Sequence, residues 1–263
     1  MPFAPGAFLG TAEFYVKYRP SYPRILTSDL LERAGIGPDA NLLDLACGTG
    51  RVALSIADAF QEVWAVDLEP EMLAAARQLD AKRSNPFPPI HWVQADADSF
   101  YPPESVSLIT IGDAFHRLDQ ARVIENAMRV LTPGGVLATL GSYTFMGGPE
   151  PWQQLVSKLM DEFTGRNISG AERPPPDTHP NAEVFRSAGF SEVANYSFDV
   201  LQSWTPDTLV GFLKSTSVCS RRTLGSRADE FESRLRRMLA SQEPTGIFRE
   251  VACFGYTFGR KPA

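Results

Sequence analysis

Short apolar runs alternate with amphipathic stretches from about residue 41 onward, a pattern typical of a parallel β-sheet whose strands are connected by helices. The apolar runs are nearly continuous, as expected of strands that are buried on both faces. They predict strands at Asn41–Ala46, Glu62–Val66, Ile90–Gln94, Val106–Ile111 and Gly135–Leu140. The stretches between them predict helices at Arg51–Ala59, Pro70–Asp80 and Gln120–Leu131.

The segments on either side of this region follow a different pattern. Two short helices are predicted before it, over Ala12–Tyr18 and Arg24–Ala34, because the prolines at positions 20 and 23 keep the intervening residues out of helix. After residue 143 the pattern predicts an amphipathic helix at Trp152–Phe163, followed by a loop around Arg173-Pro-Pro-Pro. A helix at Asn181–Ala188 and a strand at Glu192–Val200 come next. Helices within Ser203–Glu243 and a last strand at Phe248–Phe258 complete the prediction.

These elements predict an α/β fold, a Rossmann-like parallel sheet flanked by helices, with a helical cap. We expect six segments: an N-terminal helical lid (1–40), the cofactor-binding core (41–142), a cap or lid insertion (143–180), a return to the core (181–202), a helical cap insertion (203–245) and a closing strand (246–263).

Composition narrows the classes of function. The 25 basic and 31 acidic residues give a net charge of −6, which argues against a surface built for nucleic acid. The three cysteines have no spacing that suits zinc or a disulfide framework, and no apolar run approaches the ~20 residues of a membrane span. We therefore expect a cytoplasmic monomer or homodimer that binds a small molecule and contacts neither metal, nucleic acid nor membrane.

A glycine turn between the first strand and the first core helix is the strongest chemical signal. Gly48 and Gly50 allow the backbone to approach a ligand at the head of a helix. Asp67 follows roughly twenty residues later, at the end of the second strand, where a carboxylate accepts hydrogen bonds from ribose. This spacing predicts a nucleotide site but also fits the dinucleotide pattern G-x-G-x-x-A, so an NAD-dependent oxidoreductase on the same fold is an alternative.

Four motifs in order carry a more specific resemblance: Asp44-Leu-Ala-Cys-Gly-Thr-Gly50, Ala65-Val-Asp-Leu-Glu-Pro-Glu-Met-Leu73, Gln94-Ala-Asp-Ala97 and Leu131-Thr-Pro-Gly-Gly135. Together they resemble the class I S-adenosylmethionine-dependent methyltransferases, whose seven-stranded sheet has an antiparallel last strand. Tyr15-Val-Lys-Tyr-Arg-Pro-Ser-Tyr-Pro23 and Ala114-Phe-His116 resemble the small-molecule branch that includes trans-aconitate methyltransferase-like enzymes. The resemblance implies methyl transfer from S-adenosylmethionine to a small molecule, with S-adenosylhomocysteine as product.

The resemblance also implies which residues bind the cofactor. Asp67 would hold the ribose diol, Leu68 and Met72 would pack on adenine, and Asp96 with Ala97 would contact the edge of the adenine ring. Gly48 and Gly50 would pass beside the methionine and ribose portions, Asp44 would orient the turn or meet the amino group, and Arg19 would neutralise the methionine carboxylate. The remaining residues assigned to this site are Tyr18, Ala46 and Gly112.

Acceptor chemistry is expected around His116, which follows the fourth strand at the carboxyl end of the sheet. It would act as a base for a hydroxyl or ammonium acceptor, whereas a carboxylate acceptor needs no base and would be positioned by Arg117. Arg117 stands where the family pattern usually has tryptophan. Other residues expected at the acceptor are Tyr15, Tyr22, Tyr143, Phe145 and Trp152. A role in specialised metabolism, or a non-methylating role such as a cyclase, is also compatible with the divergent cap.

Overall fold

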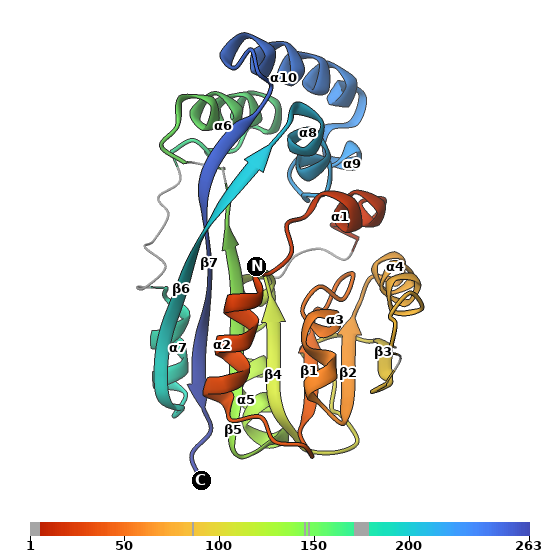
Figure 1. Cartoon of the computed structure of the whole chain (residues 1–263), viewed down its shortest axis with the longest axis vertical. Coiled ribbons are helices and arrows are strands. Elements are labelled where there is room, and N and C mark those ends of the chain that lie inside the picture. The colour runs from red at the N-terminus through yellow and green to blue at the C-terminus, as the bar shows by residue number, and fades with distance from the viewer. Residues whose placement is uncertain (1–5, 86, 145, 147, 171–178) are drawn as a thin grey trace.

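The computed structural model describes residues 6–85, 87–144, 146, 148–170 and 179–263. Seven strands form one sheet in the order β3-β2-β1-β4-β5-β7-β6. Neighbouring strands from β3 through β5 are parallel, whereas β7 is antiparallel to both β5 and β6 (Figure 1). The structure therefore confirms the predicted Rossmann-like sheet with a reversed last strand.

The strands are β1 (Asn41–Leu45), β2 (Glu62–Asp67), β3 (Ile90–Gln94), β4 (Val106–Gly112), β5 (Leu131–Tyr143), β6 (Ser191–Trp204) and β7 (Phe248–Arg260). The α-helices are α1 (Ala12–Tyr18), α2 (Arg24–Ala34), α3 (Ala53–Ile56), α4 (Pro70–Asp80), α5 (Gln120–Val130), α6 (Pro151–Thr164), α7 (Asn181–Ser187), α8 (Pro206–Lys214), α9 (Arg221–Leu224) and α10 (Ala228–Gln242). Short 3₁₀ turns cover Ala57–Ala59, Phe115–Arg117 and Gly225–Arg227. Within the described ranges, no helix has both the length and the apolar character that crossing a bilayer requires.

The main difference from the predicted elements lies after the glycine turn. A helix is predicted over Arg51–Ala59, but α3 is a single turn that begins at Ala53 and continues as the 3₁₀ turn. The Ala53 amide donates to the Asp44 carboxylate at 3.1 Å, so the end of β1 fixes where the helix begins. In the second half, β5 and β6 are longer than predicted, and the expected proline-rich loop at Arg173 lies outside the described residues.

Helices cover both faces of the sheet and bury its apolar side chains. On one face, α2 contributes Leu26 and Leu30, both fully buried, to a cluster with the sheet and α3. On the other face, Val123 of α5 and Phe185 of α7 are fully buried against the sheet. Complete burial of each such side chain stabilises the fold by about 1.5–3 kcal/mol, so the sheet forms a rigid base for its carboxyl end.

The cap has a hydrophobic core of its own. Helices α6, α8, α9 and α10 surround the ends of β6 and β7, which pair antiparallel as far as Trp204 and Phe248. Figure 1 shows these two long strands carrying the cap above the carboxyl ends of the parallel strands. The buried Glu250 carboxylate accepts hydrogen bonds from the Trp204 indole at 2.7 Å and the Gln153 amide at 2.9 Å, which ties α6 to the strands.

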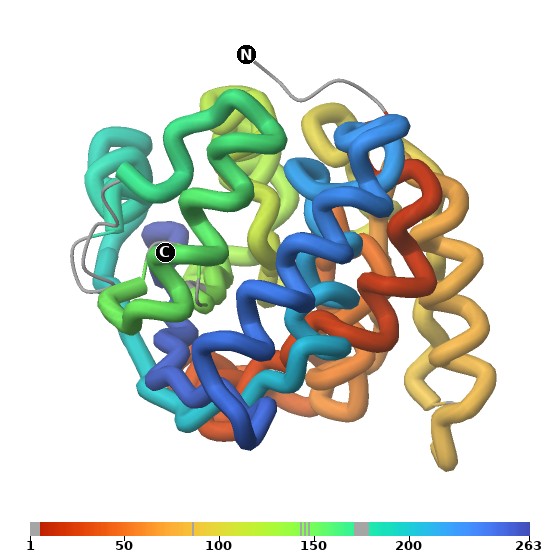
Figure 2. The backbone as a smooth tube through the Cα atoms, turned by 90° about the horizontal axis from the view of Figure 1, so that it is seen from above, coloured from red at the N-terminus to blue at the C-terminus, as the bar shows by residue number. Residues whose placement is uncertain are grey.

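Helix α1 lies between the cap and α4, beside the sheet's carboxyl end (Figure 2). Its last residue, Tyr18, packs so closely on Gly211 of α8 that a Cβ there would lie 2.3 Å from the tyrosine ring. Phe14 stacks on Tyr18 with ring centroids 6.3 Å apart. The glycine in α8 therefore admits an aromatic ring that fixes the N-terminal lid against the cap.

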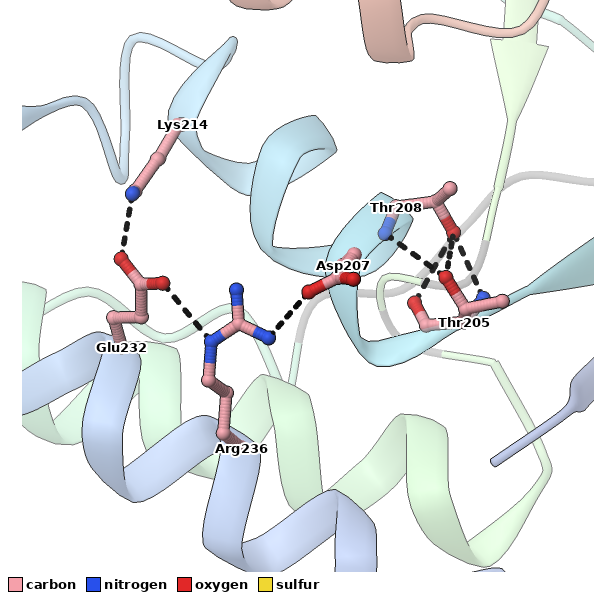
Figure 3. Close-up of polar contacts among 6 residues, drawn as sticks. All are labelled: Thr205, Asp207, Thr208, Lys214, Glu232 and Arg236. Carbon is pink, nitrogen blue, oxygen red and sulfur yellow. Dashed lines mark hydrogen bonds and ion pairs between the residues drawn. The ribbon is translucent and has the colours of Figure 1, made fainter. Parts of the chain in front are cut away.

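Charged side chains join α8 to α10 next to this contact (Figure 3). Glu232 of α10 accepts from Lys214 at 2.5 Å and from Arg236 at 2.9 Å, and Arg236 also reaches Asp207 at 2.6 Å. At the start of α8, Thr205 accepts the Thr208 amide, which caps the helix. Since Glu232 bonds two cations and is only 25% exposed, its removal unpairs both at once.

We predict that Glu232→Ala lowers the free energy of unfolding by about 0.5–1.5 kcal/mol, because two partly shielded ion pairs are lost together. Urea denaturation measures the effect. Asp229→Ala is the matched control on the same helix: its pair with Arg221 is about three-quarters exposed and should contribute nothing measurable. Equal effects of the two substitutions would contradict the proposed role of the Glu232 network.

Candidate functional site

The turn after β1 adopts backbone angles that depend on glycine. Gly48 and Gly50 have φ of +56° and +78°, and Ala46 before them has φ of +51°. A Cβ on Gly50 would lie 2.4 Å from the Trp92 ring, so this position needs glycine for space as well as for conformation. Strain at a non-glycine residue such as Ala46 is typical of a backbone held for a ligand.

Asp44 orients this turn from inside the fold. Its side chain is fully buried, accepting from the Thr110 hydroxyl of β4 at 2.7 Å and from the Ala53 amide of α3 at 3.1 Å. Burial raises the pKa of Asp44 to about 7, and these two hydrogen bonds oppose the rise. Asp44 thus joins three elements at the carboxyl end of the sheet.

Asp67, at the end of β2, holds the same turn from the other side. One carboxylate oxygen accepts from the Gly48 amide at 2.7 Å and the other from the Glu69 amide at 2.9 Å. Burial raises its pKa above the ordinary range, although the backbone hydrogen bonds act in the opposite direction. The carboxylate is 9% exposed and borders a cleft, where lone pairs of both oxygens can accept further hydrogen bonds.

This cleft, the cofactor cleft, has a volume of about 400 Å³. Ten of the residues predicted to bind the cofactor or the acceptor line it. They are Tyr15, Ala46, Gly48, Asp67, Leu68, Met72, Asp96, Ala97, Gly112 and Arg117. Sequence reasoning missed the other lining residues, which are Ala7, Phe8, Glu69, Asp98, Asp113, Ala114 and Leu118. Most of these follow a motif by one or two positions, whereas Phe8 belongs to the lid and had no pattern to mark it.

Two residues expected at the cofactor lie elsewhere. The Arg19 guanidinium lies between the rings of Tyr15 and Phe212, 4.7 Å from each centroid, and its Nε donates to Ser215 of the cap at 2.9 Å. Tyr18 packs on Gly211 of α8. Both side chains fasten the lid to the cap, a contact between residues nearly 200 positions apart that their local motif does not reveal. Neither Arg19 nor Tyr18 lines the cofactor cleft in this structure.

A second cavity, the acceptor cavity, has a volume of about 390 Å³ and shares Asp113 and Ala114 with the cofactor cleft. His116 lines it, and so does His179, which lies just before α7. Six further lining residues have uncharged hydrogen-bonding side chains: Gln120, Thr139, Ser142, Asn181, Tyr256 and Thr257. His179 belongs to no recognisable sequence motif. It lies at this cavity because the fold brings the residues just before α7 next to it.

The two histidines have pKa values below the ordinary value. Burial is the main cause for His116, and the charges of Arg117 and His179 add to it. Burial alone lowers the pKa of His179. A lowered pKa favours the neutral imidazole at pH 7. The Nδ1 atom of His179 accepts from the Asn181 amide at 3.3 Å. His116 accepts a long hydrogen bond from Arg117, with 3.3 Å between Nε2 and Nε.

The other residues expected at the acceptor are dispersed. Tyr22 is 5% exposed and donates to Asp113 at 3.0 Å, and Trp152 is buried in the core of the cap, with its ring 5.3 Å from that of Phe248. Trp152 thus stabilises the cap instead of lining the acceptor cavity. Tyr143 is the last residue of β5, and Phe145 lies outside the described residues. No cluster of three potential metal ligands occurs in the described part of the chain.

Comparison with known proteins agrees with this geometry. Residues 43–139 match the methyltransferase domain family. A trans-aconitate 2-methyltransferase of Azoarcus is 33% identical over 127 residues, 47% of each chain, and an uncharacterised methyltransferase of Schizosaccharomyces pombe is 26% identical over 79% of this chain and 77% of its own. The matched family and these relatives support an S-adenosylmethionine-dependent methyltransferase.

The fold of this methyltransferase is shared along almost its full length with a solved structure. A methyltransferase from Thiobacillus denitrificans, determined with S-adenosylhomocysteine, superposes with a TM-score of 0.55 over 98% of this chain and 99% of its own at 15% identity. The dinucleotide alternative raised by the glycine pattern is therefore set aside in favour of S-adenosylmethionine, since the matched family covers the glycine turn, Asp67 and Asp96 together.

The burial of Asp44 predicts a specific pH dependence of stability. Because its pKa is raised in the fold, the protonated form stabilises the native state at low pH, and this contribution is lost as pH rises through about 7. Asp44→Asn does not titrate and can still accept from Thr110. The stability of the wild type relative to this variant should fall on the order of 2–3 kcal/mol between pH 5 and pH 8.

Urea denaturation at several pH values measures this difference. Asp58→Asn is the control for the same chemical change at an exposed aspartate, because the Asp58 side chain is 78% exposed. If the free energies of unfolding of the wild type and of Asp44→Asn differ by the same amount across this pH range, the pKa of Asp44 is not raised in the fold.

Proposed function

We propose that this enzyme transfers the methyl group to a hydroxyl oxygen of a small-molecule acceptor bound in the acceptor cavity. The observation that supports this is the adjacency of the two cavities, which share Asp113 and Ala114 as a common wall. Two ligands in these cavities would meet at that wall, where proximity and exclusion of water favour transfer. Specialised metabolism is the setting that we propose, because the cap that covers the site lies outside the matched family region.

The residues of the cofactor cleft fit S-adenosylmethionine. Asp67 offers carboxylate oxygens for a ribose diol, Met72 and Leu68 offer apolar surface for a purine, and Asp96 offers an acceptor for its amine. Bound there, the sulfonium supplies a methyl group that is already activated for attack by a nucleophile. The protein therefore needs to orient the two ligands and to accept the proton that the acceptor hydroxyl loses.

His116 is placed to take that proton. Its imidazole is neutral at pH 7 because burial lowers its pKa, and its 3.3 Å hydrogen bond from Arg117 is long enough for an acceptor hydroxyl to compete for the nitrogen. The hydroxyl proton would move to His116 as the new oxygen–carbon bond forms. The uncharged hydrogen-bonding groups around it, such as Asn181 and Ser142, suit a hydroxylated molecule.

A carboxylate acceptor is the second candidate, favoured by the similarity to a trans-aconitate 2-methyltransferase. Such an acceptor needs no base and would be held by a cation. Arg117 is the cation that the sequence placed at the acceptor. Its guanidinium, however, lies 4.5 Å above the Phe8 ring, and Arg117 lines the cofactor cleft. The paired neutral histidines therefore favour the hydroxyl acceptor.

His116→Ala should reduce the rate about 100-fold at pH 7 with a phenolic probe such as catechol, because general base catalysis contributes about 10²–10⁴. In the wild type the rate should rise with pH through the lowered pKa of His116 and then level off, since the neutral form is the active one. The variant should lose this dependence. Mass spectrometry of the methylated product measures the rate.

His91→Ala is the matched control, because His91 lies on β3, is 45% exposed and bonds Glu62. It should retain the wild-type rate and pH profile. Methylation of trans-aconitate in preference to catechol, with a rate that His116→Ala leaves unchanged across pH, would contradict the proposal and favour the carboxylate acceptor.

A further inference from the structure

Arg51, the first residue after the glycine turn, has an unusual environment for an arginine. Its side chain is 15% exposed, and its guanidinium lies 4.6 Å above the Tyr22 ring. One terminal nitrogen donates to the Pro20 carbonyl, and the other lies 3.6 Å from the Asp113 carboxylate. The distance to Asp113 is longer than a charge-assisted hydrogen bond, so this pair leaves donor capacity on Arg51.

The Nε atom of Arg51 is buried and has no hydrogen-bond partner among the described residues. A buried donor without a partner costs roughly 1–3 kcal/mol, and more when the group is charged. A bound ligand is one source of the missing acceptor. A guanidinium suits a carboxylate best, because its nitrogens form a planar fork that matches the two oxygens.

A narrow cavity lined by Arg51 lies next to the cofactor cleft. Its volume is about 20 Å³, room for about one water-sized group. Arg51, Tyr22 and Asp44 line it, and it shares Tyr15, Ala46 and Gly112 with the cofactor cleft. The narrow cavity thus continues the cleft at the end of β1 and β4, and only the terminal atoms of a bound ligand would enter it.

We propose that Arg51 binds the carboxylate of the methionine portion of the cofactor. The adenosine end is expected at Asp67 and Asp96, on the loops after β2 and β3, so an extended ligand that crosses Ala46 and Gly112 brings its amino-acid end to the narrow cavity. Arg51 takes the role that the N-terminal motif suggested for Arg19. This inference concerns cofactor binding alone and goes beyond the proposed acceptor chemistry.

Paired ligands test the assignment without any acceptor. S-adenosylhomocysteine carries the carboxylate, and 5′-methylthioadenosine shares its adenosine but lacks the amino-acid portion. Arg51→Gln should weaken S-adenosylhomocysteine about 10- to 100-fold, the loss expected for a charged hydrogen bond, and should change the affinity for 5′-methylthioadenosine less than about twofold. Isothermal titration calorimetry measures both. Arg51→Lys should recover part of the loss, because the charge remains.

Arg19→Gln is the matched control, since the Arg19 guanidinium, like that of Arg51, lies over the Tyr15 ring but bonds the cap. It should change the affinities for both ligands by the same factor. The proposal would be overturned if Arg51→Gln weakened the two ligands equally, which would mean that Arg51 only supports the cleft, or if Arg19→Gln alone weakened S-adenosylhomocysteine selectively. Neither outcome depends on the proposal of a hydroxyl acceptor. If that proposal is wrong, only the methylation assays will show it.

Discussion

The buried carboxylate of Asp44 is the constraint on which the site depends. It bonds a hydroxyl on β4 and an amide at the start of α3, so the ends of two central strands and the helix after the glycine turn share one anchor. Asp67 then fixes the Gly48 amide from the neighbouring strand. With these bonds in place, Ala46, Gly48 and Gly50 are held at positive φ, and the cofactor cleft lies beside this turn.

A second arrangement places the cap over this cleft. Strands β6 and β7 run past the rest of the sheet and carry four helices with their own hydrophobic core. The lid helix α1 fits between that cap and α4, secured by Tyr18 on Gly211 and by Arg19 on Phe212. The core and cap therefore have separate sources of stability, and the cavities lie where the two parts meet the strand ends.

The sequence predicted the elements whose signals are local. Helices α1, α2 and α4 begin and end at the predicted residues, because prolines and glycines mark their boundaries, and the buried parallel strands stand out as apolar runs. The cofactor cleft was also predictable in large part, since its residues follow directly after strand ends in recognisable motifs.

Contacts between distant segments account for what the sequence did not predict. Helix α3 is shortened by a bond to Asp44, and Arg19 is drawn away from the cleft by Phe212, almost 200 positions later. Trp152 lies in a cap core whose partners come from α10 and β7. His179 lies at the same cavity as His116 because α7 packs beside β6 and β7, and no spacing along the chain indicates that proximity.

The central claim is that adenosine binds between the glycine turn and the carboxylates of Asp67 and Asp96. Calorimetric titration of S-adenosylhomocysteine into the wild type and into Asp67→Asn tests it most directly. We expect binding to the wild type, no binding of NAD, and at least a roughly 30-fold weaker affinity in the variant, because an amide replaces the charged acceptor for the ribose hydroxyls. Equal affinity in both proteins, or no binding to the wild type, would contradict it.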